Sequence, residues 1–338
     1  MVFMKVLLYQ RGEKALSKSG IGRAMKHQVR ALTEAGVPFT TDENDSYDIV
    51  HINTVDLAAR AMANKARKEG KKVVYHAHST EEDFRNSFIF SNQLSPLFKM
   101  HIISSYELGD YILTPTPYAK EILESYGIEK PIQAVSNGID LARFTHDDSK
   151  VKAFREYFNL PEDRKVIISV GLYFERKGLP DFMEVARALP EYTFIWFGHT
   201  PLASVTSKVR DAIREKPNNV ILPGYIKGDI IEGAYASADV FFFPSYEETE
   251  GIVVLEALAS RCQTIVRDIG VYDPWLVHEE SCYKGNSIRD FVYLIRAYLR
   301  DELPSTTEAA YKVAEERSIK EIGIQLKDVY ERVLKGEY

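Results

Sequence analysis

Cysteine is almost absent from this sequence, since Cys262 and Cys282 are the only two among 338 residues. Two isolated cysteines supply neither a disulfide framework nor the spacing of a zinc site, so we expect reduced core residues. No apolar run approaches the ~18 residues that span a bilayer. The first residues, MVFMKVLLYQRGEK, lack a cleavage site of small residues and predict a β-strand rather than a signal peptide. We therefore expect a cytoplasmic protein.

The chain also lacks the basic excess of nucleic-acid-binding proteins, because its net charge is -6. Residues 1–150 carry equal numbers of acidic and basic side chains, so the whole excess of acid falls on residues 151–338. One local basic cluster comprises Arg60, Lys65, Arg67, Lys68, Lys71 and Lys72. It has two interpretations: a solvated helix face, or a surface attracted to an anionic membrane, where each basic residue adds about 1 kcal/mol.

Short apolar strands alternate with amphipathic helices along the whole chain. This alternation is typical of parallel sheets covered by helices on both faces. In the first half we expect strands at Lys5–Tyr9, Asp48–Ile52, Lys72–Tyr75, Tyr111–Thr114 and Ile132–Val135. In the second half we expect them at Lys165–Val170, Tyr192–Phe197, Val220–Leu222, Val240–Phe243 and Thr264–Val266.

A glycine turn and a polar stretch between Asn137 and Asp147 interrupt this pattern. We therefore predict an α/β protein with two doubly wound Rossmann-like domains, residues 1–145 and 146–315, facing each other across a cleft. Residues 316–338 are predicted to form a C-terminal helix, for which a return to the first domain is one possibility. In open parallel sheets, ligands bind outside the carboxyl ends of the strands, so motifs placed there are the site candidates.

The most informative motif, VFFFPSYEETEGIVVLEALAS, runs from Val240 to Ser260. An apolar strand ends at Pro244, an acidic loop follows, and Gly251 opens an apolar helix that contains Glu256. Free amides at a helix N-terminus favour a diphosphate, and carboxylates accept hydrogen bonds from sugar hydroxyls. These features predict a binding site for a sugar nucleotide. The alternative is an ordinary strand–loop–helix unit whose acidic residues complement the helix dipole.

Three further motifs follow predicted strands. In GLYFERKG, which begins at Gly171, the basic pair Arg176 and Lys177 is suited to gripping phosphate oxygens, although exposed basic pairs are often only solvated. HAHST begins at His76 and contains two histidines. Each has two interpretations: it forms a hydrogen bond with a sugar hydroxyl, or it has a structural role. In SKSGIG, residues 17–22, small residues allow a close approach of the backbone to a ligand or simply form a tight turn.

Asp83 to Ile103 combines many apolar side chains with Arg85 and Lys99. One interpretation is a mobile acceptor-binding segment that touches lipid. The other is an ordinary helix packed on the first domain.

Taken together, the motifs resemble retaining glycosyltransferases of family 4, which have the two-domain GT-B fold. The resemblance covers almost the whole chain and rests on Glu248 and Glu256 with Gly251 between them, RKG at 176–178, NGID at 137–140 and the glycine-ended strand at Gly198. HSTEEDF, from His78, looks like bacterial enzymes that glycosylate diacylglycerol. SKSGIG and GLYFERKG look most like enzymes that add a second hexose to monoglucosyldiacylglycerol.

The resemblance implies a role for each matching residue. Glu248 would contact the transferred sugar, Lys177 with Arg176 would stabilise the departing diphosphate, and His78 would lie beside the donor sugar. Glu256 would bind the ribose hydroxyls of UDP. The remaining nucleotide-binding positions implied are Gly20, Gly171, Gly198, Gly224, Tyr225, Ile226, Gly251, Ile252 and Val253. No metal or other cofactor is implied, and the sequence shows no Asp-x-Asp metal clamp.

Two departures bear on these roles. Many relatives carry Arg directly after the glycine at 171, where this chain has Leu172, so Lys177 would carry more of the phosphate contact. The usual Gly-Phe after the first glutamate is here Thr249-Glu250, so sugar preference does not transfer with the motif.

The resemblance thus implies a retaining hexosyltransferase that moves galactose or glucose from a UDP-sugar to glucosyl-diacylglycerol. Such an enzyme would be peripheral on the inner face of the cell membrane, with the N-terminal domain on the anionic surface and no nucleic-acid partner. The alternatives are an enzyme of the same fold acting on a cell-wall or capsular saccharide, a non-catalytic sugar-nucleotide sensor, and a Rossmann oxidoreductase. The glycine loop lacks the full dinucleotide fingerprint that the oxidoreductase would need.

Overall fold

The computed structural model describes residues 4–10 and 19–338, so Ser17 and Lys18 of the SKSGIG motif lie outside the described residues. The chain separates into two compact units. Unit 1 comprises the described residues up to Phe84, Gln93–Ile139 and Arg317–Tyr338, and unit 2 comprises Arg85–Asn92 and Asp140–Glu316. Within the described part of the chain, no helix has both the length and the apolar character that a membrane span requires.

The segment Arg85–Asn92 differs from the prediction, which placed it in the N-terminal domain. Its backbone is tied to unit 2: the Ile89 amide donates to Ser204 O at 3.1 Å, and the Arg176 amide donates to Asn86 O at 3.0 Å. These bonds join positions far apart in the sequence, which the local pattern of residues does not encode.

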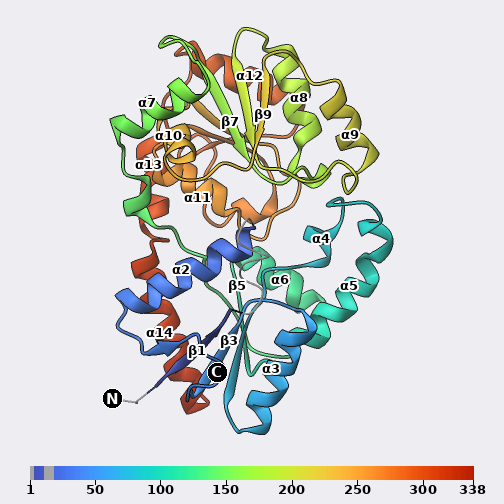
Figure 1. Cartoon of the computed structure of the whole chain (residues 1–338), viewed down its shortest axis with the longest axis vertical. Helices are drawn as coiled ribbons and strands as arrows, with labels where there is room; N and C mark the ends of the chain where they lie inside the picture. The colour runs from blue at the N-terminus through green and yellow to red at the C-terminus, as the bar shows by residue number, and fades with distance from the viewer. Residues whose placement is uncertain (1–3, 11–18) are drawn as a thin grey trace. The chain divides into compact units, whose positions relative to one another are not determined.

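Unit 1 is built on a six-stranded sheet in the order β2-β1-β3-β4-β5-β6, and its strand pairs are parallel (Figure 1). The strands are β1 (Val6–Tyr9), β2 (Phe39–Thr40), β3 (Ile49–Ile52), β4 (Lys72–His76), β5 (Tyr111–Thr114) and β6 (Ile132–Ala134). The helices between them are α2 (Gly20–Glu34), α3 (Leu57–Lys68), α4 (Glu81–Phe84), α5 (Ser91–Tyr106) and α6 (Pro117–Ser125).

The C-terminal helix α14 (Ile319–Lys335) belongs to unit 1, where it lies beside α2 (Figure 1). Its start is fixed by two backbone bonds, from the Ile139 amide to Arg317 O at 2.9 Å and from the Ile319 amide to Ile139 O at 3.0 Å. A Cβ on Gly323 would lie 2.3 Å from Ala31 O, so glycine permits the close approach of the two helices.

Unit 2 is built on a second parallel sheet in the order β12-β11-β10-β7-β8-β9. The strands are β7 (Val166–Val170), β8 (Thr193–Phe197), β9 (Val220–Gly224), β10 (Val240–Phe243), β11 (Thr264–Arg267) and β12 (Tyr283–Gly285). The α-helices are α7 (Asp148–Tyr157), α8 (Leu179–Ala188), α9 (Ser207–Arg214), α10 (Asp229–Ser237), α11 (Ile252–Ala259), α12 (Ile288–Leu299) and α13 (Thr307–Glu315). Short 3₁₀ helices are η1 (Leu141–Phe144), η2 (Glu175–Lys177) and η3 (Gly270–Tyr272).

Both sheets have the buried, apolar strands expected of parallel sheets with helices on both faces. All ten predicted strands are present, and the predicted two-sheet α/β fold is confirmed. The structure adds two short edge strands, β2 and β12. Helix α9 begins at Ser207, because the hydroxyl of Thr206 caps it by accepting a hydrogen bond from the Val209 amide.

Candidate functional site

The strand order of unit 2 defines where a ligand of this fold binds. From β7 the chain moves outward through β8 and β9, and it then returns to β10 on the other side of β7 before continuing through β11 and β12. The order therefore reverses between β7 and β10, and in open α/β sheets the crevice at such a switch point is the ligand site. The loops that follow these two strands carry Lys177 and Glu248.

Gly178 brings these two loops into direct contact. Its φ is 75°, and a Cβ there would lie 2.3 Å from Pro244 O. Glycine therefore meets two requirements at this position, since it tolerates positive φ and leaves room for the neighbouring backbone. The close approach places the residue before it, Lys177, against the loop after β10.

Lys177 and Glu248 form an ion pair in which Lys177 Nζ lies 2.5 Å from Glu248 Oε1. The hydroxyl of Ser245 donates to the same carboxylate oxygen at 2.7 Å. The side chains are only 15% and 6% exposed, so the pairing offsets part of the cost of burying two charges. The structure thus brings together two residues that the sequence separates by 71 positions.

Arg176 is hydrogen-bonded to the loop that carries Glu248. Its Nη1 donates to Glu247 O at 3.1 Å and lies 4.0 Å from Glu248 Oε1. Its Nε donates to Ser87 Oγ at 2.8 Å, which anchors the segment Arg85–Asn92 to the site. With a relative exposure of 8%, Arg176 is buried, and its predicted contact with the diphosphate stays a prediction.

Helix α11 presents an open N-terminus beside the ion pair. Its N-cap is Gly251, with a φ of 91°, and no side chain caps the helix. The first amides of a helix have no acceptor within it, so those of Ile252 and Val253 are suited to receive an anion. The predicted set Gly251, Ile252 and Val253 therefore lies where the resemblance placed it, at the start of a helix.

Glu256 lies one turn into α11 and is 2% exposed. Its Oε2 accepts a hydrogen bond from the hydroxyl of Tyr235 on α10 at 2.8 Å. Tyr235 orients the carboxylate that we predicted to bind ribose hydroxyls, and its contribution was not anticipated from the sequence.

Three predicted glycines meet at the carboxyl ends of β7, β8 and β9. The Gly171 amide donates to Phe197 O and the Gly198 amide donates to Gly224 O, both at 2.8 Å. A Cβ on Gly198 would lie 2.0 Å from Gly171 O, so these backbones approach more closely than any other residue would allow. Tyr225, which follows Gly224, is 39% exposed, and Ile226 is half-buried.

The two remaining predicted residues, Gly20 and His78, lie in unit 1. Gly20 is the first residue of α2, where the hydroxyl of Ser19 caps the helix, and a Cβ on Gly20 would meet nothing within 4 Å. His78 follows β4 and is buried; its Nε2 lies 2.7 Å from Asn53 Oδ1. Burial lowers the pKa of His78 to about 3, so the imidazole is neutral at physiological pH.

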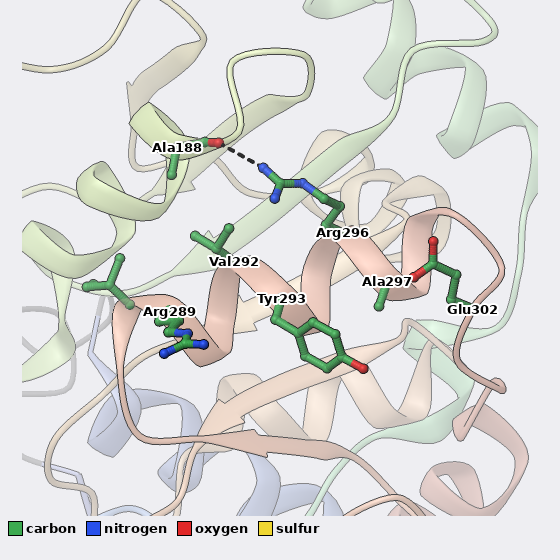
Figure 2. Close-up of a pocket in the computed structure, with 8 residues that line it drawn as sticks. Ala188, Arg289, Val292, Tyr293, Arg296, Ala297 and Glu302 are labelled. Carbon is green, nitrogen blue, oxygen red and sulfur yellow. Dashed lines mark hydrogen bonds between the residues drawn. The ribbon is translucent and has the colours of Figure 1, made fainter.

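A groove on α12 lies apart from these residues (Figure 2). It is lined by Ala188, Ile288, Arg289, Val292, Tyr293, Arg296, Ala297 and Glu302, none of which we predicted for the site. Figure 2 shows the hydrogen bond from Arg296 Nη2 on α12 to Ala188 O, whose length is 3.2 Å. Among residues 4–10 and 19–338, no cluster of three or more His, Cys, Asp or Glu side chains has an arrangement that would hold a metal ion.

Comparison with known proteins identifies the family of this chain. Residues 40–143 match the model of Glycosyltransferase Family 4, and residues 150–317 match that of Glycosyl transferases group 1. The chain is 48% identical over 335 residues to the processive diacylglycerol alpha-glucosyltransferase of Acholeplasma laidlawii, covering 98% of this chain and 99% of that protein. The chain belongs to the family 4 glycosyltransferases. The predicted family and the prediction of an enzyme are thereby confirmed.

This glycosyltransferase is also similar to a more distant relative and to a solved structure. It is 24% identical to the alpha-galactosylglucosyldiacylglycerol synthase of Streptococcus pneumoniae, over 80% of this chain and 74% of that protein. Among solved structures, Anabaena HepE in complex with UDP-glucose superposes with a TM-score of 0.74 and 16% identity, covering 97% of this chain and 99% of that chain. The latter likeness establishes the GT-B fold alone.

Sequence reasoning missed the residues that orient the predicted ones. Ser245 stands in the motif but was not singled out, although a hydroxyl three residues before Glu248 is well placed to bond it. Asn53 offered a further signal, because it follows β3 just as His78 follows the neighbouring β4, and carboxyl ends of parallel strands meet at one edge of a sheet.

Proposed function

We propose that this glycosyltransferase moves a hexose, glucose or galactose, from a UDP-sugar to glucosyl-diacylglycerol, with retention of the anomeric configuration. The observation that carries the proposal is the ion pair of Lys177 and Glu248 beside the open N-terminus of α11. It combines a cation for phosphate, a carboxylate for hydroxyl groups and free amides within one small region.

Each part of the UDP-sugar has a group in unit 2 that is suited to bind it. Amides of Ile252 and Val253 receive diphosphate oxygens, and Glu256, oriented by Tyr235, accepts from the ribose hydroxyls. Lys177 exchanges part of its contact with Glu248 for the diphosphate, and Glu248 then accepts from a sugar hydroxyl. The complex of Anabaena HepE with UDP-glucose supports a UDP-sugar as the donor class.

The transfer step places the developing charge on the diphosphate. The bond from the anomeric carbon to the β-phosphate oxygen breaks, and a bond from that carbon to the acceptor oxygen forms on the same face. The acceptor proton passes to the departing diphosphate, so no side chain is required as a general base. Lys177 stabilises the leaving group, a type of contribution that typically changes rates by 10²–10³-fold.

The names of the relatives support a diacylglycerol-based acceptor. That of the Acholeplasma laidlawii protein favours glucose as the hexose, whereas that of the pneumococcal protein favours galactose. The test is product analysis after incubation of the protein with membrane lipid extract and several UDP-sugars. A dihexosyl-diacylglycerol is the expected product, and transfer only to a lipid-free saccharide would overturn the acceptor assignment.

Unit 1 offers a surface suited to a membrane. On α5, Leu94, Leu97 and Met100 recur every third residue with relative exposures of 44%, 64% and 68%. Helix α3 carries the exposed bases Lys65, Arg67 and Lys68, and it is joined to α5 by Arg60, whose Nη1 donates to Ser104 and Ser105. We propose that the enzyme is peripheral on the inner face of the cell membrane, with the apolar stripe in the acyl boundary and the bases at anionic head groups.

Vesicle sedimentation tests this membrane contact. Anionic vesicles should pellet the wild type, and charge reversal at Lys65, Lys68 and Lys72 should weaken binding by about 1 kcal/mol per residue at low salt. Leu97→Ser with Met100→Ser should weaken it at any salt concentration. Equal sedimentation of all variants would contradict this contact without affecting the donor site in unit 2.

A further inference from the structure

Trp196 on β8 fixes the peptide that follows β7. Its indole Nε1 donates a hydrogen bond to Gly171 O at 2.8 Å, and its side chain is completely buried. The amide of Gly171 donates to Phe197 O, also on β8, at 2.8 Å. Both backbone hydrogen-bonding groups of Gly171 therefore point towards β8.

The amide of the next residue, Leu172, points the other way. The peptide that joins Gly171 to Leu172 is trans, and in a planar trans peptide the carbonyl and the following N–H point in opposite directions. The Leu172 N–H therefore points away from β8. The strand on the other side of β7 is β10, so this amide is directed towards the side of the switch point that carries Glu248 and the N-terminus of α11.

The amide of Leu172 also differs from its neighbours in its hydrogen bonding. The Gly171 amide donates to Phe197 O, and the Tyr173 amide donates to Thr200 Oγ1 at 3.0 Å. Among residues 4–10 and 19–338, no group accepts a hydrogen bond from the Leu172 amide, although the residue is half-buried. Since backbone amides that are shielded from water are nearly always paired, this donor is suited to a ligand.

The side chain of Lys177 lies beside the same peptide. A Cβ on Gly171 would lie 3.8 Å from both Cγ and Cδ of Lys177, whose Nζ extends to Glu248. A backbone N–H and an ammonium group in one place suit an anion, because hydrogen bonds to charged oxygens are about twice as strong as those between neutral groups.

We propose that the Leu172 amide donates a hydrogen bond to a phosphate oxygen of the UDP-hexose, and that Trp196 is the positioning residue that turns this amide towards the ligand. The inference rests on the proposed function, in which Lys177 contacts the diphosphate. It deepens that function by accounting for Leu172, which stands where many relatives carry Arg. In this chain a backbone N–H supplies the phosphate contact that an arginine side chain would otherwise make.

NMR of the UDP complex tests the contact directly. In protein that contains nitrogen-15 leucine, the amide signal of Leu172 is assigned by its loss in Leu172→Ile. This signal should move downfield when UDP is added, and it should show coupling to a phosphorus nucleus across the hydrogen bond. Uridine, which has no phosphate, should shift it far less. No shift with UDP, or an equal shift with uridine, overturns the proposal.

Calorimetric titration with UDP tests the positioning role. Trp196→Phe keeps an aromatic ring in the core but loses the indole N–H, and it should weaken UDP binding by about tenfold, as expected for one hydrogen bond to a charged group. Adding Leu172→Arg to this variant should restore the affinity, because a guanidinium contacts phosphate without help from the amide. Affinity that is unchanged in Trp196→Phe, or that Leu172→Arg does not restore, overturns the positioning role, because a mere loss of packing would not respond to Arg at 172.

Trp275→Phe is the matched control. The Trp275 indole donates to Val271 O at 2.7 Å and its side chain is 6% exposed, so this variant loses an equivalent bond in the same unit. Its affinity for UDP should equal that of wild type. Should Trp196→Phe not fold, replacement of Leu172 by its α-hydroxy acid keeps the side chain and removes the N–H. This replacement should weaken UDP binding by about tenfold, and unchanged affinity would overturn the proposal.

These measurements separate failure of the inference from failure of the proposed function, because UDP binding is measured without any acceptor. Wild-type affinity for UDP in both Trp196→Phe and the α-hydroxy acid variant overturns the inference while the donor site stands. Absence of UDP binding by the wild type overturns the proposed function and, with it, the inference.

Discussion

The buried histidines His51, His76 and His78 predict that unit 1 loses stability as the pH falls from about 7.5 to about 5.5. Burial lowers the pKa of His51 and His78 to about 3 and lowers that of His76 as well, whereas a histidine in an unfolded chain has a pKa of about 6.5. In this interval the three histidines become protonated in the unfolded state but stay neutral in the folded state. Stability therefore rises with pH; its loss begins as the pH falls below about 6.5 and continues to about 3, where His51 and His78 take up protons in the folded state as well.

The magnitude follows from the same linkage. Lowering the pH from about 7.5 to about 5.5 stabilises the unfolded state by about 1.4 kcal/mol for each histidine that stays neutral in the fold. Three such residues give about 4 kcal/mol, a large fraction of the 5–15 kcal/mol typical of folded domains. Most carboxylates titrate below this interval, so their contribution is small.

Hydrogen exchange provides the assay, because it reports each unit separately. The opening free energy should be measured for peptides from β3, β4 and α14, all in unit 1, at both pH values after correction for intrinsic exchange rates. Trp196 and Trp275 both lie in unit 2, so tryptophan fluorescence during urea unfolding is an internal control that should depend less on pH. His76→Gln should reduce the slope in unit 1 by about a third.

A change below about 1 kcal/mol in the opening free energy of the β4 peptides would refute this reasoning. It would mean that the imidazoles accept protons in the folded state. The fold could do so only if water reached the ends of β3 and β4.

Three further predictions concern unit 2. Lys177→Ala should lower the transfer rate at least 100-fold with the fold intact by circular dichroism; activity near that of wild type would contradict the role of the ion pair. Gly178→Ala should destabilise unit 2 by about 3 kcal/mol or more in urea unfolding, because the new Cβ would lie 2.3 Å from Pro244 O, whereas Gly336→Ala in unit 1, with nearly the same backbone conformation (φ of 73°) but nothing within 4 Å, should cost about 1 kcal/mol. Glu256→Gln should weaken UDP binding about tenfold in calorimetry, and Tyr235→Phe should weaken it less, because it removes only the hydroxyl that orients the carboxylate; unchanged affinity in Glu256→Gln would remove this residue from the donor site.

The sequence predicted the strands because each is an apolar run bounded by turn residues, a signal that local reasoning captures. It did not predict β2, which has two residues, or β12, which has three, because such short edge strands depend on a neighbouring strand rather than on their own composition. The sequence also did not predict that Arg85–Asn92 belongs to unit 2. This assignment depends on the bond of Ser87 to Arg176, whose partners lie 89 positions apart.

For the candidate site, the resemblance selected residues whose proximity only the structure reveals. Lys177 and Glu248 meet because β7 and β10 are neighbours in the sheet and because Gly178 permits contact between their loops. The sequence motif contained the residues but not this pairing. The orienting side chains Ser245, Tyr235 and Asn53 were missed because each acts through a partner that folding supplies.

The central claim is that the carboxyl ends of β7 and β10 in unit 2 hold the UDP-hexose. A crystal structure of the complex with UDP-glucose tests it most directly. The account predicts the diphosphate against the amides of Ile252 and Val253, with Lys177 Nζ on a phosphate oxygen and Glu248 on a sugar hydroxyl. A nucleotide bound elsewhere, such as in the groove on α12, with the pair of Lys177 and Glu248 unaltered, would contradict it.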